Sequence, residues 1–299
     1  EVIPYPTLTK AREFFEKGLF EPEDRGARAE RVRARVAAAV PPAARPAFSE
    51  FCASMPEAYF LSTPEEMILG HGELRQRCAE SEAAGEHPPL ATQLTHFPER
   101  EYSEFAICTR DRPGLFAMLS GVLAAHGLNI LAARITTSHD GVALDAFRIS
   151  HEDSDGGRDT ERWERVERTL RGVLGGGIDV EELVRRSERP SILARRRRRV
   201  PTSVEIDNQV SRECTVLDVY TGDRVGLLFA ITNCLYHLWL EIHLAKITTM
   251  VDQVLDVFYV TDSEGRKIDD PGRLETIRAA LVQALEPEAT PAEVRAAGA

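Results

Sequence analysis

The sequence predicts an α+β fold in which two copies of one unit follow a helical segment. The first observation is a change of hydrophobic period within a few residues. Apolar or β-branched side chains alternate at period two over residues 102–109, as in a half-buried strand, and then recur at helical spacing over 113–126. The second observation is that the same change of period returns at 215–220 and 225–238. A strand that leads into a helix, repeated once along the chain, indicates a duplicated unit.

The duplication is visible in the residues themselves. Two stretches return at one offset of 112 residues: DRPGL at 111–115 returns as DRVGL at 223–227, and ARITT at 133–137 returns as AKITT at 245–249. LDAF at 144–147 returns as LDVF at 255–258, one residue earlier than that offset requires. The lost residue falls between them, where Asp and Gly indicate a hairpin turn that tolerates changes of length.

Each copy can be divided into strands and helices by period and by its turn residues. In the first copy we expect strands at 102–109, 128–138 and 142–150, helices at 113–126 and 159–174, a short helix at 180–186 and a fourth strand at 202–206. In the second copy we expect strands at 215–220, 240–250 and 253–261 and helices at 225–238 and 271–285. Gly156 and Gly157 precede the second helix of the first copy, and Gly175 follows it. The order βαββαβ is that of a ferredoxin-like sandwich, although no fourth strand is evident in the second copy.

The part before the first copy is expected to be helical. Residues 8–19 and 27–40 have helix-forming composition with apolar side chains at helical spacing. A third helix should begin at Ser62 or Thr63, which would cap it, with Pro64 in its first turn. The predicted organisation is a helical segment at 1–100, a first unit at 101–208, a second at 212–286 and a flexible tail at 287–299.

Composition limits the classes of function. The 299 residues contain 37 Lys and Arg against 48 Asp and Glu, so the formal net charge is −11. This balance argues against a general nucleic-acid binder, because contacts with phosphates need a basic surface. No apolar run reaches the length of a membrane span, and no signal peptide is evident, so we expect a cytoplasmic protein. The five cysteines are scattered without a C-x-x-C pair, which predicts neither a disulfide framework nor a zinc site. Because the chain begins at Glu1 without Met, we expect a piece of a longer protein.

The turn between the first strand and the first helix is the candidate binding site. Pro113 suits the first turn of a helix, and Gly114 allows another backbone or a ligand to approach closely. The N–H groups of that turn would face a ligand placed above it, and Asp111 and Asn129 could bind a ligand's polar groups. The alternative is that Asp111 only caps the helix and Asn129 only caps a strand. The recurrence of Asp-Arg-x-Gly-Leu in both copies favours the binding site.

These motifs resemble a known family. The DRPGL turn, the LNI strand at 128–130 and the βαββαβ order look like ACT domains, small modules that bind amino acids at this turn and at the edge of the next strand. Two such units, with LDVFYVTD at 255–262 and YFLST at 59–63 before them, resemble the carboxy-terminal part of the bifunctional uridylyltransferase/uridylyl-removing enzymes. The resemblance covers about residues 55–286 and is most specific in the second copy.

The resemblance implies which residues would hold the ligand, expected to be glutamine. In the first copy they are Asp111, Arg112, Pro113, Gly114, Leu115, Asn129 and Ile130. In the second copy the matching candidates are Asp223, Arg224, Gly226, Leu227 and Glu241. The second copy departs from the pattern, since Val225 replaces the proline and Glu241 replaces the asparagine. We therefore expect the main site in the first copy.

The resemblance also implies an activity for the whole enzyme. The family modifies the PII nitrogen-signalling protein by nucleotidyl transfer and phosphodiester hydrolysis, with Mg²⁺ as cofactor. This sequence has no Gly-Ser followed by Asp-x-Asp, so we expect no catalytic residues, no metal site and no cofactor in it. We expect instead an allosteric region that senses glutamine and acts on catalytic domains upstream in the same polypeptide. The alternative is a free-standing sensor or protein-interaction module without enzymatic activity.

Three other patterns have structural interpretations. Counting from the hairpin turns predicts that Arg134 faces Asp145 and that Lys246 faces Asp256 as cross-strand ion pairs. His139 and Asp140 match the dipeptide of metal-dependent phosphohydrolases, but they are expected in a solvated hairpin turn. The basic run at 195–199 is interpreted as a linker or as a contact with an acidic neighbour.

Overall fold

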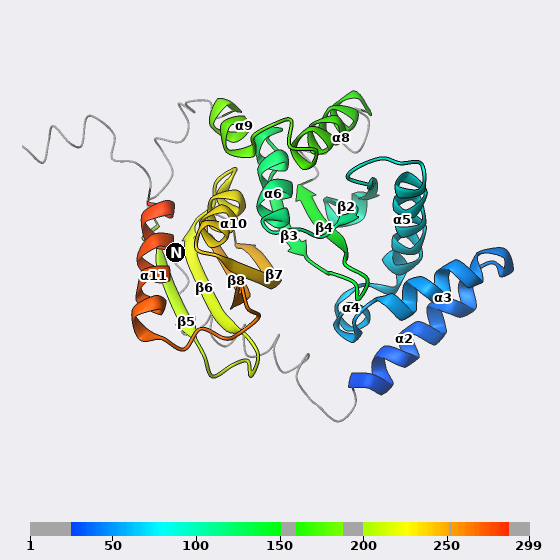
Figure 1. The fold of residues 1–299 in the computed structure, drawn as a ribbon, viewed down its shortest axis with the longest axis horizontal. Helices are drawn as coiled ribbons and strands as arrows, with labels where there is room; N and C mark the ends of the chain where they lie inside the picture. Colours follow the sequence, from blue (N-terminus) through cyan, green and yellow to red (C-terminus); the bar gives the residue numbers. More distant parts are fainter. Residues whose placement is uncertain (1–24, 151–159, 188–199, 251–252, 287–299) are drawn as a thin grey trace, which may run out of the picture. The chain divides into compact units, whose positions relative to one another are not determined.

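The computed structural model describes residues 25–150, 160–187, 200–250 and 253–286 (Figure 1). The helix expected at 8–19, the Gly156-Gly157 pair, the run at 195–199 and the tail at 287–299 lie outside the described residues. The chain forms two compact units, which are described separately. The first unit falls within residues 1–112 and 130–179, and the second within 113–129 and 180–299.

The first unit combines the helical segment with a four-stranded sheet. Its helices are α2 (Arg25–Ala39), α3 (Arg45–Ser54), α4 (Glu57–Ser62), α5 (Glu65–Ala83) and α8 (Thr160–Leu174), with short 3-10 turns at Pro42–Ala44 and Pro98–Arg100. Its strands are β1 (Leu90–Phe97), β2 (Tyr102–Arg110), β3 (Ile130–Arg134) and β4 (Val142–Ser150). Pro64 is the N-cap residue of α5, and no side chain caps this helix, so the cap expected from Ser62 or Thr63 is wrong.

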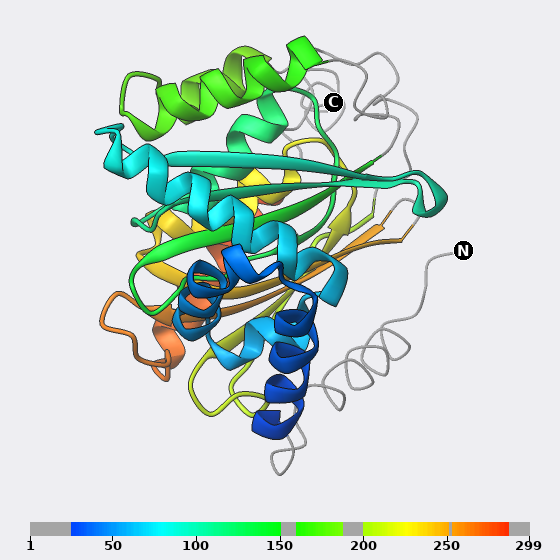
Figure 2. The same cartoon turned by 90° about the vertical axis from the view of Figure 1, so that its right-hand side faces the viewer.

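The first sheet has the order β1-β2-β4-β3, and all its neighbours are antiparallel. Helix α5 lies along β1 and β2, as Figure 2 shows, and Leu74 and Cys78 of α5 share a core with Cys108 of β2. On the other face Trp163 of α8 packs against Phe105 with tilted rings, 4.9 Å between the ring centroids. Both faces of this sheet are therefore covered, which explains why β2 is buried along nearly its whole length.

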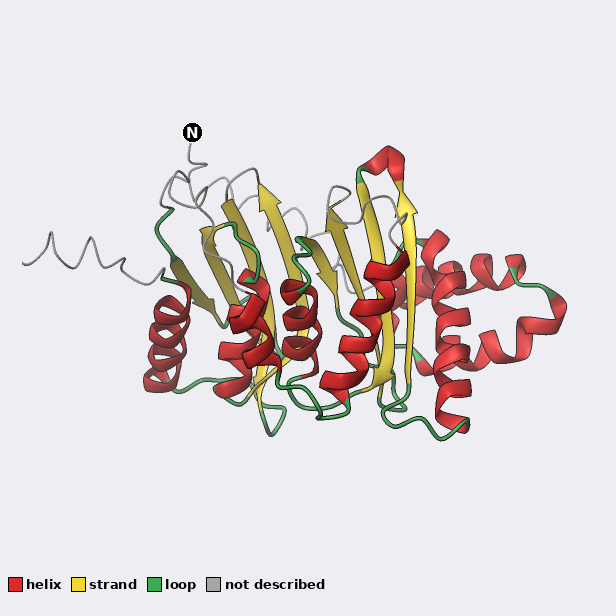
Figure 3. Ribbon diagram, turned by 90° about the horizontal axis from the view of Figure 1, so that it is seen from above, coloured by secondary structure: helices red, strands yellow, loops and turns green. Residues whose placement is uncertain are grey.

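The second unit contains a second four-stranded sheet and four helices among the described residues. Its helices are α6 (Leu115–Ala125), α9 (Val180–Ser187), α10 (Leu227–His237) and α11 (Pro271–Leu285). Its strands are β5 (Ser203–Asp207), β6 (Thr215–Gly222), β7 (Leu240–Met250) and β8 (Gln253–Asp262), in the antiparallel order β5-β6-β8-β7. Helices α10 and α11 pack on each other and against β7 and β5, and Figure 3 shows strands and helices as separate layers. The α+β class predicted from the sequence is confirmed.

The fourth strand of each sheet differs from the expectation. The strand expected at 202–206 as the last of the first copy is β5, and it pairs with β6 in the second sheet. The corresponding edge of the first sheet is occupied by β1, in a region that was expected to be helix or loop. Ala91 pairs with Cys108 and Ser203 pairs with Tyr220, so the edge strands also repeat at the offset of 112 residues. Each sheet therefore takes its fourth strand from the residues before its strand-helix turn.

The helices of the two copies meet inside the second unit. The hydroxyl groups of Ser120 on α6 and Thr232 on α10 lie 3.1 Å apart and are buried, and these two residues occupy equivalent positions, 112 residues apart. A Cβ on Gly114 would meet the ring of Tyr236, and a Cβ on the equivalent Gly226 would lie 3.9 Å from Ala124. The start of each helix thus faces the end of the other. Contact between equivalent residues is typical of a two-fold relation, here a local pseudo-symmetry of α6 and α10.

The hairpin registers are one residue away from those expected. Arg134 pairs with Ala146, and Lys246 pairs with Val257, so neither basic side chain faces Asp145 or Asp256. A shift of one residue moves a side chain to the other face of a sheet. In the first copy the shift arises because Ser138 closes the turn: its N–H donates to Val142 O at 2.8 Å, and Thr137 faces Ala143. In the second copy Met250 pairs with Gln253, whereas Thr249 was expected there.

Arg134 lies in a buried polar chain that joins the helical segment to the first sheet. Tyr59 OH lies 2.8 Å from His71 Nδ1, His71 Nε2 lies 3.3 Å from Glu104 Oε1, and Arg134 Nη1 lies 3.7 Å from Glu104 Oε2. Burial raises the pKa of Glu104, but the neighbouring imidazole of His71 and the charge of Arg134 outweigh burial and hold that pKa below its usual value. Glu104 is therefore an ionised carboxylate inside the unit, stabilised by its partners.

Candidate functional site

The strand-helix turn has the same backbone in both copies. Helices α6 and α10 begin at Leu115 and Leu227, each after a left-handed glycine at the N-cap, with φ of 75° at Gly114 and 82° at Gly226. Pro113 precedes α6, so the helix starts two residues later than expected. No side chain caps either helix. The positive end of each helix dipole is therefore not neutralised by a capping side chain, as an anion site requires.

Asp111 holds the end of β2 on the β3–β4 hairpin. Its N–H donates to Gly141 O at 3.0 Å, and its Oδ2 accepts from Thr137 Oγ1 at 3.0 Å. Its Oδ1 accepts from the N–H of Arg112 at 2.8 Å. The carboxylate therefore caps its own turn and does not cap α6. It is exposed, so it remains accessible to a ligand's ammonium group.

Arg112 makes a contact that the sequence did not suggest. Its Nη1 donates to the carbonyl of Leu174 at 2.6 Å, and Leu174 is the last residue of α8. A guanidinium at a helix C-terminus satisfies an orphan carbonyl and complements the negative end of the dipole. This contact assigns Arg112 a structural role at the end of α8.

The space beside Gly114 is occupied by Tyr236. A Cβ on Gly114 would lie 2.8 Å from Cε2 of that ring, and the positive φ already disfavours any other residue. Both residues belong to the second unit. The close approach that Gly114 was expected to allow is thus made by an aromatic side chain of the chain itself. Tyr236 remains 39% exposed, so its ring also presents a free surface.

The remaining candidates lie where the next strands begin. Asn129 is half-buried in the turn before β3, and Ile130 is the first residue of β3, paired with Ile149. In the second copy Glu241 is exposed on β7 opposite Thr261, and Val225 is 56% exposed. Asp111, Arg112 and Ile130 belong to the first unit, whereas Pro113, Gly114, Leu115 and Asn129 belong to the second. The candidates of the second copy, residues 223–227 and Glu241, all lie in the second unit.

Sequence reasoning missed one buried acid behind the first turn. Asp145 on β4 is 1% exposed, and its Oδ1 accepts from the N–H of Thr136 at 3.3 Å while its Oδ2 has no hydrogen-bond partner. Burial raises the pKa of Asp145 to about 8, and the negative charge of Asp111 adds to this effect. The sequence did offer a signal for a buried acid, because the LDxF motif occurs in both copies. Asp256, its acid in the second copy, is also buried.

The His139-Asp140 dipeptide lies in the β3–β4 turn, as expected. Asp140 Oδ2 accepts from Arg75 Nη2 at 2.7 Å, so an ion pair to α5 holds the turn. In the described part of the chain, no group of three or more His, Cys, Asp or Glu side chains could hold a metal ion. The helices of this part also include none that is long and apolar enough to cross a membrane.

Family models match both copies. The ACT domain model matches residues 105–162, and the model of the ACR family N-terminal ACT domain matches residues 210–288. The chain contains two ACT domains. The first match begins in β2 and the second ends just beyond α11, so together they cover most strands of both sheets.

Curated relatives extend the likeness upstream of the ACT domains. The bifunctional uridylyltransferase/uridylyl-removing enzyme of Rhodospirillum rubrum is 36% identical over 230 residues, which cover 76% of this chain and 24% of the relative. The enzyme of the same name from Gluconobacter oxydans is 36% identical over 207 residues, covering 68% of this chain and 22% of the relative. The match is to the carboxy-terminal part of these enzymes, so the resemblance stated from the motifs is confirmed. The chain spans about a quarter of the length of these relatives.

Two solved structures also share similarity. The aspartate kinase from Synechocystis is 17% identical, with a TM-score of 0.33, over 60% of this chain and 26% of that one. The ligand-free regulatory subunit of aspartate kinase from Thermus thermophilus is 13% identical, with a TM-score of 0.21, over 66% of this chain and 97% of that one.

Proposed function

We propose that the two ACT domains form a regulatory region that binds glutamine and controls catalytic domains of the same polypeptide. The observation that carries the proposal is the repeated strand-helix turn, in which a left-handed glycine opens a helix without a capping side chain. It is supported by the ACT domain models, which match both copies. A helix start of this kind suits a carboxylate, because its N–H groups and its dipole both favour negative charge.

The chemistry of glutamine would match the candidate residues of the first ACT domain. Its carboxylate would accept from N–H groups at the start of α6, after Gly114. The exposed carboxylate of Asp111 is of the kind that binds an ammonium group, and the side chain of Asn129 offers both a donor and an acceptor for polar groups. Arg112 is engaged with the end of α8 and would act by shaping the turn. In the second ACT domain Glu241 would repel a nearby ligand carboxylate, so this site is proposed as the weaker one.

The rest of the proposal concerns the longer protein. By analogy with the relatives, uridylyl transfer to a PII nitrogen-signalling protein and removal of the uridylyl group would be performed in the cytoplasm by domains upstream of this chain. Magnesium would belong to those domains, because the described residues offer no cluster of acidic or imidazole side chains that fits the ion. Glutamine would act by binding one conformation of the ACT domains more tightly than another.

A thermal-shift measurement with the purified chain tests the binding step. Each common L-amino acid is added separately, and D-glutamine serves as a control of equal charge and composition. A ligand that binds only the folded state raises the melting temperature in proportion to its saturation. We expect L-glutamine to raise it and D-glutamine to leave it unchanged. If no amino acid raises the melting temperature, the second candidate function stands: a protein-interaction module that binds a partner without a small ligand.

A further inference from the structure

The hairpin between β3 and β4 of the first unit makes contacts on two sides. The hairpin, residues 138–142, is closed by Ser138, whose Oγ accepts from the N–H of Val142 at 3.0 Å, and Gly141 takes a φ of 74°. Its backbone is thus fixed by its own hydrogen bonds.

On one side the hairpin holds the strand-helix turn. Gly141 O accepts from the N–H of Asp111 at 3.0 Å, and Asp140 O accepts from Arg110 Nη1 at 3.0 Å. Thr137, next to the hairpin, donates to the Asp111 carboxylate. Arg110 and Asp111 are therefore bonded to the hairpin through two hydrogen bonds and to the adjacent Thr137 through a third. Any displacement of Asp111 on ligand binding must displace this hairpin or break those bonds.

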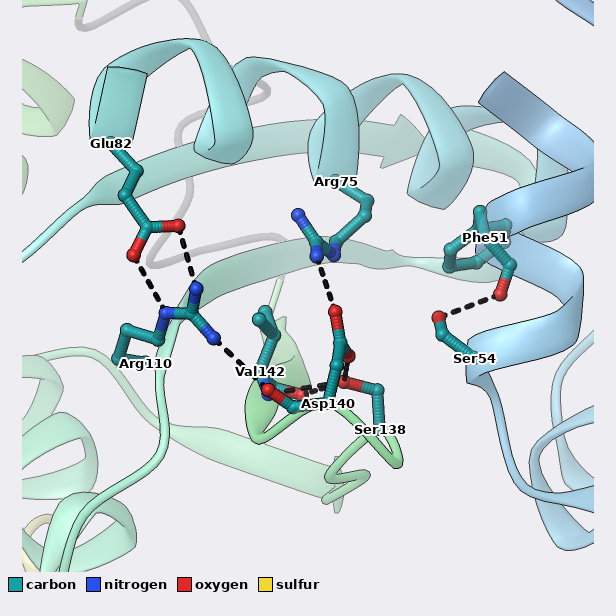
Figure 4. Close-up of polar contacts among 8 residues, drawn as sticks. All are labelled: Phe51, Ser54, Arg75, Glu82, Arg110, Ser138, Asp140 and Val142. Carbon is teal, nitrogen blue, oxygen red and sulfur yellow. Dashed lines mark hydrogen bonds and ion pairs between the residues drawn. The ribbon is translucent and has the colours of Figure 1, made fainter. Parts of the chain in front are cut away.

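On the other side the hairpin is bonded to the helical segment, as Figure 4 shows. Arg75 of α5 donates to Asp140 Oδ2 at 2.7 Å, and the N–H of His139 donates at 2.8 Å to the carbonyl of Ser54, the last residue of α3. Arg110 itself binds Glu82 of α5 through two parallel hydrogen bonds of 2.8 Å each. A bidentate guanidinium-carboxylate pair fixes orientation as well as distance.

Both acids of this network are ionised at neutral pH. The hydrogen bond from Arg110 lowers the pKa of Glu82. Burial raises the pKa of Asp140, but its bonds to Ser138 and Arg75 outweigh burial and lower the pKa overall. The network therefore consists of two ion pairs. Arg75 of α5 pairs with Asp140 of the hairpin, and Glu82 of α5 pairs with Arg110 at the end of β2. A charge change at any one of them leaves a neighbour without its partner.

We propose that the hairpin at 138–142, with Arg75, Glu82 and Arg110, is the joint that couples the strand-helix turn to the upstream helices α3 and α5. The ligand part of this inference rests on the proposed function, because glutamine at Asp111 would be the event that the joint transmits. The joint itself is a property of the ligand-free chain. A purely structural contact would hold α5 in place without affecting the turn. In the proposed joint, a change at α5 also changes the stability of the turn.

Hydrogen exchange of the ligand-free chain, followed by mass spectrometry, tests the joint. Glu82→Gln removes the bidentate pair from the α5 side and conserves size. We expect exchange of residues 109–112 and 136–142 to become about two- to fivefold faster, because local opening of the turn becomes easier. The matched control is Glu66→Gln. It removes the ion pair that Glu66, also on α5, makes with Arg100 at 3.0 Å, next to the start of β2. Unchanged exchange at 136–142 in Glu82→Gln would overturn the joint.

A second arm adds L-glutamine, with binding measured independently by calorimetry. We expect glutamine to slow exchange of residues 65–83 in the wild-type chain and to do so less in Asp140→Asn, which keeps the hairpin but loses the charge that binds Arg75. Heat of binding without any change in α5 exchange refutes the joint and leaves the proposed function intact. Absence of binding heat refutes the proposed function, and the ligand-free comparison still decides on the joint.

Discussion

Asp145 is a buried acid whose pKa departs far from its ordinary value. Its carboxyl group is fully enclosed on β4, and its pKa is raised to about 8 by burial, with Asp111 adding to the effect. The folded chain therefore binds a proton here between about pH 4 and pH 8 that the unfolded chain releases. Stability contributed by this group is fully present below its ordinary pKa and is lost as pH rises through the folded pKa.

We expect Asp145→Asn to stabilise the chain on the alkaline side. At pH 8 the wild type carries the cost of a buried, partly ionised acid, so the variant should unfold with a free energy higher by on the order of a few kcal/mol. Near pH 5, where the acid is protonated in the folded state, most of the difference should disappear. Urea unfolding at both pH values measures this. A wild-type stability that is flat from pH 5 to pH 8, with no gain in the variant, would contradict the raised pKa.

Asn129 and Glu241 occupy matching positions of the two ACT domains and allow a direct comparison. An amide can donate and accept, whereas a carboxylate can only accept and repels a ligand carboxylate. We expect Asn129→Ala to weaken glutamine binding by on the order of 1.5 to 3 kcal/mol, as for a lost hydrogen bond to a charged group. Glu241→Ala should change it much less. Calorimetric titration of both variants decides: a larger loss in Glu241→Ala would assign the main site to the second domain.

At the scale of secondary structure, a buried polar network links α4 and α5 to the first sheet. It consists of the side chains of Tyr59, His71, Glu104 and Arg134. Glu104 is the carboxylate among these four side chains, and it faces both His71 and Arg134. Removing one partner of a buried ion pair costs more than the pair contributes, because the other charge stays buried. The lowered pKa of Glu104 means that its stabilisation is present above its ordinary pKa and is lost as pH falls through the folded value.

We expect Glu104→Gln to destabilise the first unit at pH 7 by on the order of 3 to 5 kcal/mol, because Arg134 is left without a counter-charge. Glu66→Gln, in an exposed pair on α5, is the control and should have little effect. Urea unfolding, with the fluorescence of Trp163 as one probe of the first unit, measures both. A loss in Glu104→Gln as small as that of the control would show that the buried chain adds little stability.

The elements themselves were largely predictable, and the errors have physical causes. Period and turn residues located β4, β7, α10 and α11 to within two residues, because apolar faces and turns fix such boundaries locally. Strand β1 was missed because its side chains are mostly half-buried, with Thr, Gln and His between the apolar positions. The hairpin register was wrong by one residue because a side chain, Ser138, closes the turn. Sequence spacing cannot show such a bond.

The position of the strand-helix turn was predictable from the sequence, whereas the contacts of its residues were not. The repeated Asp-Arg-x-Gly-Leu located both helix starts to within two residues, but it did not indicate that both glycines are left-handed. The partners of Arg112 and Gly114, which are Leu174 and Tyr236, lie 62 and more residues away in the sequence, and nothing local indicates them. The predicted hairpin register placed Asp145 opposite Arg134, so Asp145 was expected to form an ion pair. The observed register pairs Arg134 with Ala146, and Asp145 is buried.

At the scale of the whole chain, the structure is a duplication in which even the edge strands repeat. The chain covers about a quarter of relatives whose name includes two catalytic activities. We expect the purified chain to show neither uridylylation of a PII protein nor removal of a uridylyl group, because its sequence lacks the Gly-Ser followed by Asp-x-Asp that marks the metal site of nucleotidyltransferases. Incubation with labelled UTP and a PII protein tests this. Transfer of label above that of a boiled sample would contradict it.

Titration calorimetry of L-glutamine into the purified chain tests the central claim most directly, since it measures binding without any catalytic domain. The account predicts saturable heat that fits one main site per chain, and a weaker response with Asn129→Ala. Heat no greater than that of dilution, with the chain shown to be folded, would contradict the claim that these ACT domains sense glutamine.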